Sequence, residues 1–157
     1  GNWGPTTEFN IQVDPEAAKI VMESGIPIVL APLNVDFEAQ LLPEEIKKIH
    51  KIKNPVADVM GGLLDFYGMS FDHQNWNFKG LPLYDPCTVA WLIDPTKFES
   101  QRCNVAVETK GELTTGETVI DYYHITNRKP NANVLFHIDR QWFADLVIDS
   151  IKSFSTK

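Results

Sequence analysis

Residues 1–10 read Gly1-Asn2-Trp3-Gly4-Pro5-Thr6-Thr7-Glu8-Phe9-Asn10, and they contain three side chains suited to binding hydroxyl groups. These are Asn2, Glu8 and Asn10, because a carboxylate accepts hydrogen bonds and an amide both donates and accepts them. If the backbone is extended here, Glu8 and Asn10 point to one face and Phe9 to the other. The set favours a neutral polyol as ligand. The alternative is a surface loop with ordinary polar residues, since connecting segments are polar by default.

The pattern of these residues continues beyond Asn10. Residues 1–18 read G-N-W-x-x-x-x-E-F-N-I-x-x-D-P-E-A-A. This resembles the nucleoside hydrolases, ribohydrolases that cleave inosine, uridine and related nucleosides. In that family the stretch lines the ribose pocket. The resemblance therefore implies that Asn2, Glu8 and Asn10 bind ribose hydroxyls and that Phe9 lies close to the nucleoside.

A second pattern lies at residues 82–90, which read P-L-Y-D-P-C-T-V-A. From the residues alone, Asp85 is the N-cap of a helix that begins at Pro86. The pattern also resembles P-[LV]-H-D-P-C-x-[VI]-A, the second hallmark of nucleoside hydrolases. In that hallmark the Asp ligates calcium, and the preceding His is thought to protonate the leaving base. The resemblance implies calcium as a cofactor, with Asp85 among its ligands.

The chain departs from the family pattern at two places. Tyr84 stands where the hallmark has His, and a phenol with a pKa near ~10 is a poorer proton donor at neutral pH than an imidazole. Purine-specific members of the family have Trp there, whose ring stacks on the base, so Tyr84 acts either by stacking or as an acid. The second departure is at residues 34–37, Asn-Val-Asp-Phe, where the family usually reads D-V-T followed by His or Lys.

Length bears on how much of the family this chain represents. Nucleoside hydrolases are about twice as long as these 157 residues, and the family's N-terminal D-x-D-P-G-x-D-D signature is absent. That signature supplies most of the calcium ligands and the catalytic base. We therefore expect residues 1–157 to be the C-terminal portion of a single nucleoside hydrolase domain. Its expected partners are the N-terminal half of the same protein, a ribonucleoside substrate and further copies in a dimer or tetramer.

Composition excludes several other classes of protein. The chain is 43% hydrophobic and 22% charged, as in globular proteins. A net charge of −7 disfavours a protein that tracks nucleic-acid phosphates, and no apolar run reaches the ~20 residues of a membrane span. Cys87 and Cys103 form neither a disulfide framework nor a zinc pattern. A reduced, cytoplasmic protein is the expectation.

Hydrophobic periodicity predicts alternating helices and strands, which is typical of an α/β fold. The resemblance specifies this as the C-terminal half of a Rossmann-like nucleoside hydrolase fold, an open and mostly parallel sheet flanked by helices. Helix start signals are Asp14-Pro15, Pro43-Glu44-Glu45, Asn54-Pro55, Asp85-Pro86 and Asp139. Strands are expected over residues 28–33, 104–108, 118–123 and 133–138, the first buried on both faces.

The segment from Ser70 to Gly80 has no clean period and suits a loop or frayed helix end over a pocket. Within it, His73 is a speculative replacement proton donor. His124 and His137 lie in or beside predicted strands and are interpreted as structural, since neither has a candidate partner nearby in sequence.

The reaction that the resemblance implies is calcium-dependent hydrolysis of the N-glycosidic bond of ribonucleosides, with an oxocarbenium-like transition state. The alternative is a non-catalytic nucleoside- or ribose-binding module that has lost turnover. Tyr84 in the His position and the altered residues 34–37 favour that alternative.

Overall fold

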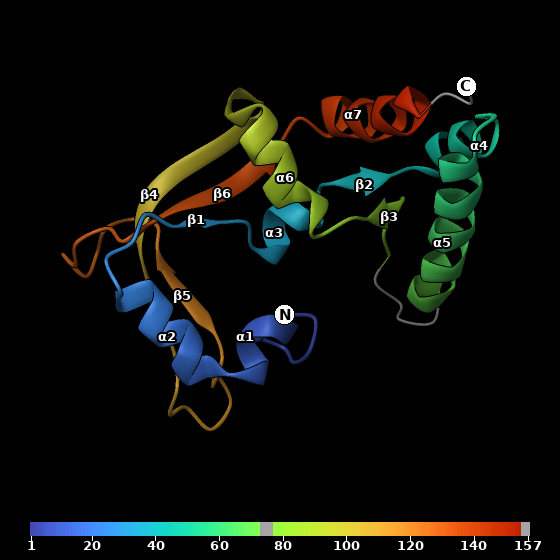
Figure 1. The fold of residues 1–157 in the computed structure, drawn as a ribbon. Coiled ribbons are helices and arrows are strands. Elements are labelled where there is room, and N and C mark those ends of the chain that lie inside the picture. Colours follow the sequence, from blue (N-terminus) through green and yellow to red (C-terminus); the bar gives the residue numbers. More distant parts are fainter. Residues whose placement is uncertain (73–76, 155–157) are drawn as a thin grey trace. The chain divides into compact units, whose positions relative to one another are not determined.

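The computed structural model describes residues 1–72 and 77–154, which divide into two compact units. The first unit comprises residues 1–34 and 98–137, and the second comprises residues 35–97 and 138–157 (Figure 1). The first unit contains Asn2, Glu8, Phe9 and Asn10. Tyr84 and Asp85 belong to the second.

Two helices open the first unit, α1 (Phe9–Val13) and α2 (Pro15–Glu23). The Asp14 carboxylate accepts a hydrogen bond from the Ala17 N–H, and Gly25 follows the helix with a φ of +79°, so the predicted start and end of α2 are confirmed. The extended backbone expected over Glu8–Asn10 is wrong. Phe9 and Asn10 are helical because the Glu8 side chain caps α1.

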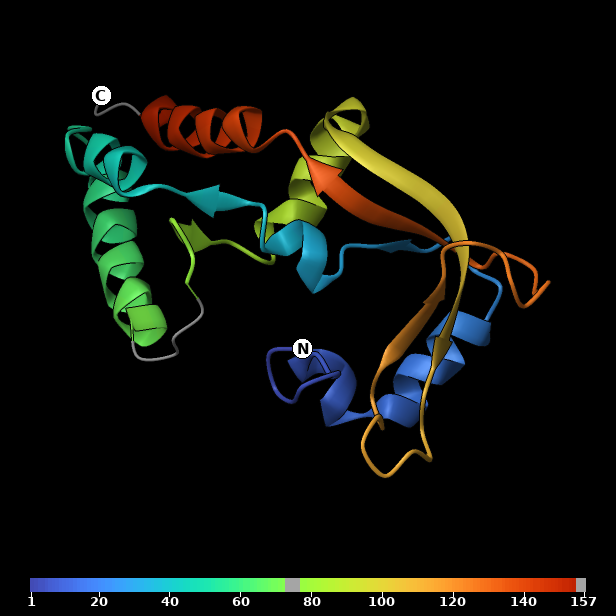
Figure 2. The same ribbon diagram turned by 180° about the vertical axis from the view of Figure 1, so that it is seen from behind.

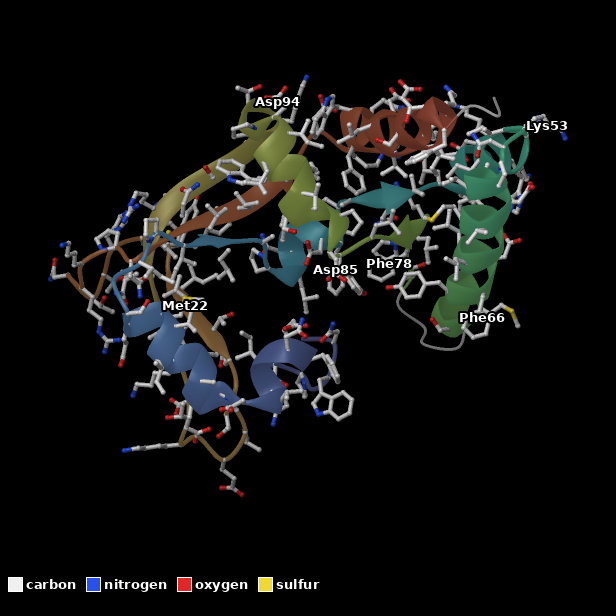
Figure 3. The ribbon with its side chains drawn as sticks, viewed as in Figure 1. Met22, Lys53, Phe66, Phe78, Asp85 and Asp94 are labelled. Atoms are coloured by element: carbon white, nitrogen blue, oxygen red, sulfur yellow. The ribbon has the colours of Figure 1, made fainter. Side chains whose placement is uncertain are left out.

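The sheet of the first unit has the strand order β1-β6-β4-β5. These strands are β1 (Val29–Leu30), β4 (Phe98–Val107), β5 (Thr118–Asp121) and β6 (Ala132–Ile138). β1 pairs with β6 in parallel, whereas β4 pairs with β5 antiparallel, so the sheet is mixed. Helix α2 lies along β4, and Met22 packs with Val105 and Val134 in the core (Figures 1 and 3). The predicted α/β class is confirmed.

The strand expected over residues 28–33 is shorter and more exposed than predicted. Only Val29 and Leu30 are strand, and Val29 is 46% exposed. β1 is an edge strand with a single neighbour in this sheet, and Pro32 has no N–H to extend the ladder. The chain then enters α3 (Leu33–Asp36).

The second unit is built on three helices, α4 (Pro43–His50), α5 (Pro55–Asp72) and α7 (Arg140–Ser153). They pack around Leu41, Ile49, Leu64 and Ile148. Asn54 caps α5 through the Ala57 N–H, and Asp139 caps α7 through the Trp142 N–H, as predicted. Asn54 also donates from its amide to the Ile151 carbonyl, which ties α5 to the end of α7.

A two-stranded antiparallel ribbon and two short helices complete the second unit. Strands β2 (Gln40–Leu41) and β3 (Leu81–Pro82) pair, then α6 (Pro86–Ile93) and the 3₁₀ turn η1 (Pro95–Lys97) follow. Asp85 lies at the start of α6 and Asp94 at its end (Figure 3). Within residues 1–72 and 77–154, no helix is long and apolar enough to cross a membrane.

Candidate functional site

Residues 1–10 form a closed turn that leads into α1. The carbonyl of Thr7 accepts hydrogen bonds from the N–H groups of Asn2, Trp3 and Gly4 at 3.1, 3.2 and 3.4 Å. The Asn2 side-chain oxygen accepts from the Phe9 N–H at 2.8 Å. Asn2 is thereby oriented through its oxygen, and its amide N–H₂ group remains available as a donor.

Glu8 and Asn10 lie together for a different reason than an extended strand. The Glu8 Oε2 atom accepts from the backbone N–H groups of Asn10 and Ile11, at 2.8 and 3.3 Å. Its Oε1 atom accepts from the Asn10 Nδ2 atom at 3.3 Å. A carboxylate has about four lone-pair sites, so Glu8 retains capacity for a ligand hydroxyl while it caps α1. The structure brings the polar pair together on one side of the helix start.

Two aromatic rings accompany these polar groups. The rings of Trp3 and Phe9 meet edge to face, with centroids 5.4 Å apart and an interplanar angle of 61°. Trp3 is 65% exposed and Phe9 48% exposed. Gly1 is needed for the tight turn, because a Cβ there would lie 2.1 Å from the Gly4 carbonyl oxygen. The structure thus places Asn2, Glu8, Phe9 and Asn10 in one hydrogen-bonded group.

The second group of predicted residues surrounds the start of α6. Asp85 is the N-cap residue by position, but its side chain makes no capping hydrogen bond to α6. The expectation that its carboxylate caps the helix is therefore wrong. Its backbone is already in the right-handed helical region, with φ −57° and ψ −37°, which is not the extended conformation of a capping residue. The exposed Asp85 carboxylate is left for another role.

Aromatic side chains gather beside Asp85. The ring of Phe37 lies 5.9 Å from that of Tyr84 and 5.0 Å from that of Phe78, measured between centroids. Phe37 and Tyr84 are both departures from the family pattern, and they contact each other. Phe78 lies near β3 (Figure 3). At positions 37 and 84, this chain has aromatic side chains where the family pattern has His or Lys and His.

Tyr67 of α5 is a member of this group that the sequence did not reveal. A hydrogen bond joins the Tyr67 and Tyr84 side chains. The pKa of Tyr67 is raised, chiefly by burial and further by the negative charge of Asp85, although the bond to Tyr84 acts the other way. Tyr67 therefore stays a neutral phenol at physiological pH. The sequence signal that could have indicated this contact was a tyrosine at a core-facing position of a helix. A buried tyrosine hydroxyl needs a polar partner.

Asp36 and Cys87 are buried residues of the same unit as Asp85. Asp36 is 6% exposed, and the Cys87 thiol donates to the Leu83 carbonyl at 3.5 Å. Burial raises the pKa of the Cys87 thiol strongly, and the charges of Asp36 and Asp85 raise it further. Cys87 therefore remains a thiol at neutral pH and is neither a nucleophile nor a thiolate ligand.

A calcium ion is matched in part by this arrangement. Calcium takes six to eight oxygen ligands, and Asp85 offers an exposed carboxylate that no capping bond engages. Among the described residues, no group of three or more His, Cys, Asp or Glu side chains could hold a metal ion. A carboxylate such as that of Asp85 suits calcium, but Asp85 alone supplies only part of the ligands that calcium needs.

Of the histidines singled out in the sequence, His124 has a described partner outside both groups. His73 lies outside the described residues. His124 Nε2 lies 3.2 Å from Gln101 Nε2 in the turn after β5, and its φ of +55° reflects that turn.

Nearly the whole chain matches a known protein family. Residues 1–145 match the family described as inosine-uridine preferring nucleoside hydrolase. The chain belongs to this family. The resemblance predicted from residues 1–18 and 82–90 is confirmed.

Curated relatives include the pyrimidine-specific ribonucleoside hydrolase RihA of Shewanella sp. (strain ANA-3), 51% identical over 99% of this chain and 49% of the relative. The protein of the same name from Escherichia coli (strain ATCC 8739) is 49% identical, over 99% of this chain and 50% of the relative. The chain spans about half the length of the curated relatives it matches.

Solved structures of nucleoside hydrolases have the same fold. The purine-preferring ribonucleoside hydrolase from Gardnerella vaginalis superposes with a TM-score of 0.83 at 27% identity, over 94% of this chain and 46% of that one. An inosine-guanosine nucleoside hydrolase reaches a TM-score of 0.84 at 24% identity, over 99% of this chain and 49% of that one.

Proposed function

We propose that this nucleoside hydrolase chain forms the sugar-binding and leaving-group part of an enzyme that hydrolyses the N-glycosidic bond of ribonucleosides. The observation that carries the proposal is the hydrogen-bonded group Asn2, Glu8 and Asn10 in a chain of this family. Pyrimidine nucleosides are the proposed substrates, because relatives about 50% identical bear the name pyrimidine-specific ribonucleoside hydrolase.

Asn2, Glu8 and Asn10 would hold the ribose. The free N–H₂ group of Asn2 and the amide of Asn10 donate to sugar hydroxyls, and the Glu8 carboxylate accepts from them. Each of these side chains is already hydrogen-bonded to its neighbours. Little conformational freedom is therefore lost when the sugar binds. The negative charge of Glu8 would also stabilise positive charge that develops on the ribose ring.

Tyr84 would contact the leaving base. Tyr84 is held by Tyr67 through a hydrogen bond and by Phe37 through ring contact. This support favours a fixed aromatic surface for the base, with the ring of Tyr84 as its working part. A proton donated by the Tyr84 hydroxyl is the competing mechanism.

Calcium is a further part of the proposal, with Asp85 as its ligand from this chain. A calcium ion held there would supply positive charge for binding hydroxyl oxygens and lowering the pKa of a water molecule. The general base and the other ligands belong in this proposal to the family's N-terminal half. We further propose assembly into a dimer or tetramer and a cytoplasmic location.

The test is a steady-state assay of the complete protein on uridine, cytidine, inosine and adenosine. We expect Glu8→Gln to lower kcat/KM by ~10²-fold, as for loss of one group that stabilises transition-state charge, and Asn10→Ala to raise KM. Gln keeps one acceptor oxygen for the cap of α1, so folding should be retained. Glu99→Gln, an exposed carboxylate on β4, is the matched control. Unchanged turnover in both site variants would refute the ribose assignment.

The second candidate function is a non-catalytic ribose- or nucleoside-binding module. It is favoured by the aromatic contact of Phe37 with Tyr84, where the family pattern has titratable residues. In that case the complete protein binds ribose or uridine in calorimetry but hydrolyses none of the four nucleosides. Glu8→Gln then weakens binding without any turnover to lose.

A further inference from the structure

The loop that joins β4 to β5 contacts the turn formed by residues 1–10. The Thr6 hydroxyl donates to the carbonyl of Leu113 at 3.3 Å. Gly116, on the same loop, has a φ of +88°. A Cβ on Gly116 would lie 2.8 Å from the Gln12 Oε1 atom and 3.3 Å from the Thr7 Cγ2 atom. In both views the loop lies at the same end of the first unit as α1 (Figures 1 and 2).

This loop, residues 108–117, is held by hydrogen bonds within itself. The Glu108 carboxylate accepts from the N–H groups of Lys110 and Gly111, at 2.7 and 3.0 Å. These two bonds lower the pKa of Glu108. The Gly116 N–H returns to the Glu108 carbonyl at 2.7 Å and closes the loop. Glu108 therefore bonds to residues near both ends of this loop and fixes its conformation.

The contact reaches the polar group through Thr7 and Gln12. Thr7 is 6% exposed, and its carbonyl holds the N–H groups of Asn2, Trp3 and Gly4. Gln12 lies in α1, the helix that Glu8 caps. A displacement of Thr7 moves Asn2, and a displacement of Gln12 moves the helix start where Glu8 and Asn10 meet.

We propose that the loop of residues 108–117 positions the ribose-binding turn, and that Gly116 is a positioning residue for substrate binding. The inference rests on the proposed function, since it names what keeps that site in shape. Glycine suits the left-handed backbone here, and a Cβ would crowd Thr7 and Gln12. The Thr6 hydroxyl supplies the second point of attachment.

The experiment compares Gly116→Ala and Gly116→Val with Gly25→Ala and Gly25→Val in the complete protein. Gly25 has a similar φ of +79°, but nothing lies within 4 Å of a Cβ there, so it controls for backbone strain alone. We expect KM for uridine to rise roughly tenfold for Gly116→Ala and towards ~10²-fold for Gly116→Val, with a smaller change in kcat. The Gly25 variants should leave KM unchanged.

Hydrogen exchange supplies a readout that does not depend on turnover. The amides of Asn10 and Ile11, which Glu8 caps, should exchange faster in the Gly116 variants, while the amides of α2 should not. Thr6→Val removes the hydroxyl donor, so these amides should again exchange faster. Thr6→Ser keeps the hydroxyl and should retain slow exchange. This pair carries the test if Gly116→Val does not fold.

The outcomes separate the two proposals. An unmodified complete protein that hydrolyses no nucleoside sinks the proposed function, yet faster exchange over residues 1–12 in the Gly116 variants still supports positioning. Equal exchange in the Gly116 and Gly25 variants overturns the positioning role, whatever the activity.

Discussion

At the residue scale, Tyr84 and Phe37 both differ from the family pattern and contact each other. Their rings lie 5.9 Å apart. Tyr84 also bonds to Tyr67, whose pKa burial has raised. The ring contact with Phe37 and the bond to Tyr67 support the proposal that Tyr84 offers its ring to a planar base.

The prediction for Tyr84 separates ring from hydroxyl. If stacking is its role, Tyr84→Phe retains most activity, and Tyr84→Ala loses the ~1–3 kcal/mol typical of base–aromatic stacking. Tyr67→Phe removes the bonded hydroxyl without touching the Tyr84 ring and should behave like Tyr84→Phe. Kinetics on uridine and inosine measure all three variants. If Tyr84→Phe fails as badly as Tyr84→Ala, the hydroxyl is the proton donor.

At the scale of elements, Glu45 and Arg140 join α4 to α7. Arg140 Nη1 lies 2.8 Å from the Glu45 Oε2 atom, and Arg140 Nη2 lies 3.0 Å from Oε1, so the contact is bidentate. Glu45 is 2% exposed. Burial alone would raise the pKa of Glu45, but the bonds from Arg140 and from the Leu42 N–H lower it overall. Arg140 also donates to the Gln40 carbonyl of β2 at 3.1 Å.

We expect Arg140→Met to destabilise the fold by ~3 kcal/mol, because it leaves a buried carboxylate without its partner. The double variant Glu45→Leu/Arg140→Met should recover much of that loss. Lys152→Met removes an exposed pair with Asp149 and should cost under ~1 kcal/mol. Urea unfolding of these three variants and of Glu45→Leu alone measures the differences, and additivity of the Glu45 and Arg140 substitutions would contradict the coupling.

The same pair predicts a pH dependence of stability. The folded pKa of Glu45 lies below its ordinary value, so the unfolded chain binds the proton more readily. The stabilisation is therefore present above the ordinary carboxylate pKa of ~4.3 and is lost as pH falls through the lower, folded value. Urea midpoints between pH 3 and pH 7 should show this loss in the unmodified protein and a weaker one in the double variant.

At the scale of the whole molecule, the chain covers about half the length of its curated relatives, and its described part holds no cluster of three metal-binding side chains. Asp85 is one carboxylate where calcium needs several oxygen ligands. The complete site is proposed to need the N-terminal half as well.

We expect calcium to raise the Tm of the complete protein by several degrees, and Asp85→Asn to remove most of that rise. Asp58→Asn, an exposed carboxylate on α5, is the control and should retain it. Residues 1–157 alone should show little change in Tm with calcium. Tight calcium binding by residues 1–157 alone, measured by calorimetry, would contradict the shared site.

Much of this protein was determined by short stretches of sequence. Asp14, Asn54 and Asp139 cap the helices that they were predicted to cap, because an N-cap bonds to an N–H group two or three residues away. The family could be recognised in the same way, from contiguous residues. Glu8 shows the limit: its neighbours indicated a polar pair but not the helix start that it caps.

Only the tertiary structure decided which distant residues meet. Thr6 and Leu113 are 107 positions apart, Glu45 and Arg140 are 95 apart, and nothing in either local pattern couples them. The same holds for Phe37 with Tyr84, and for the Asp85 carboxylate, which local pattern assigned to a cap. Such contacts depend on the path of the whole chain, because burial and packing bring together side chains that sequence spacing does not.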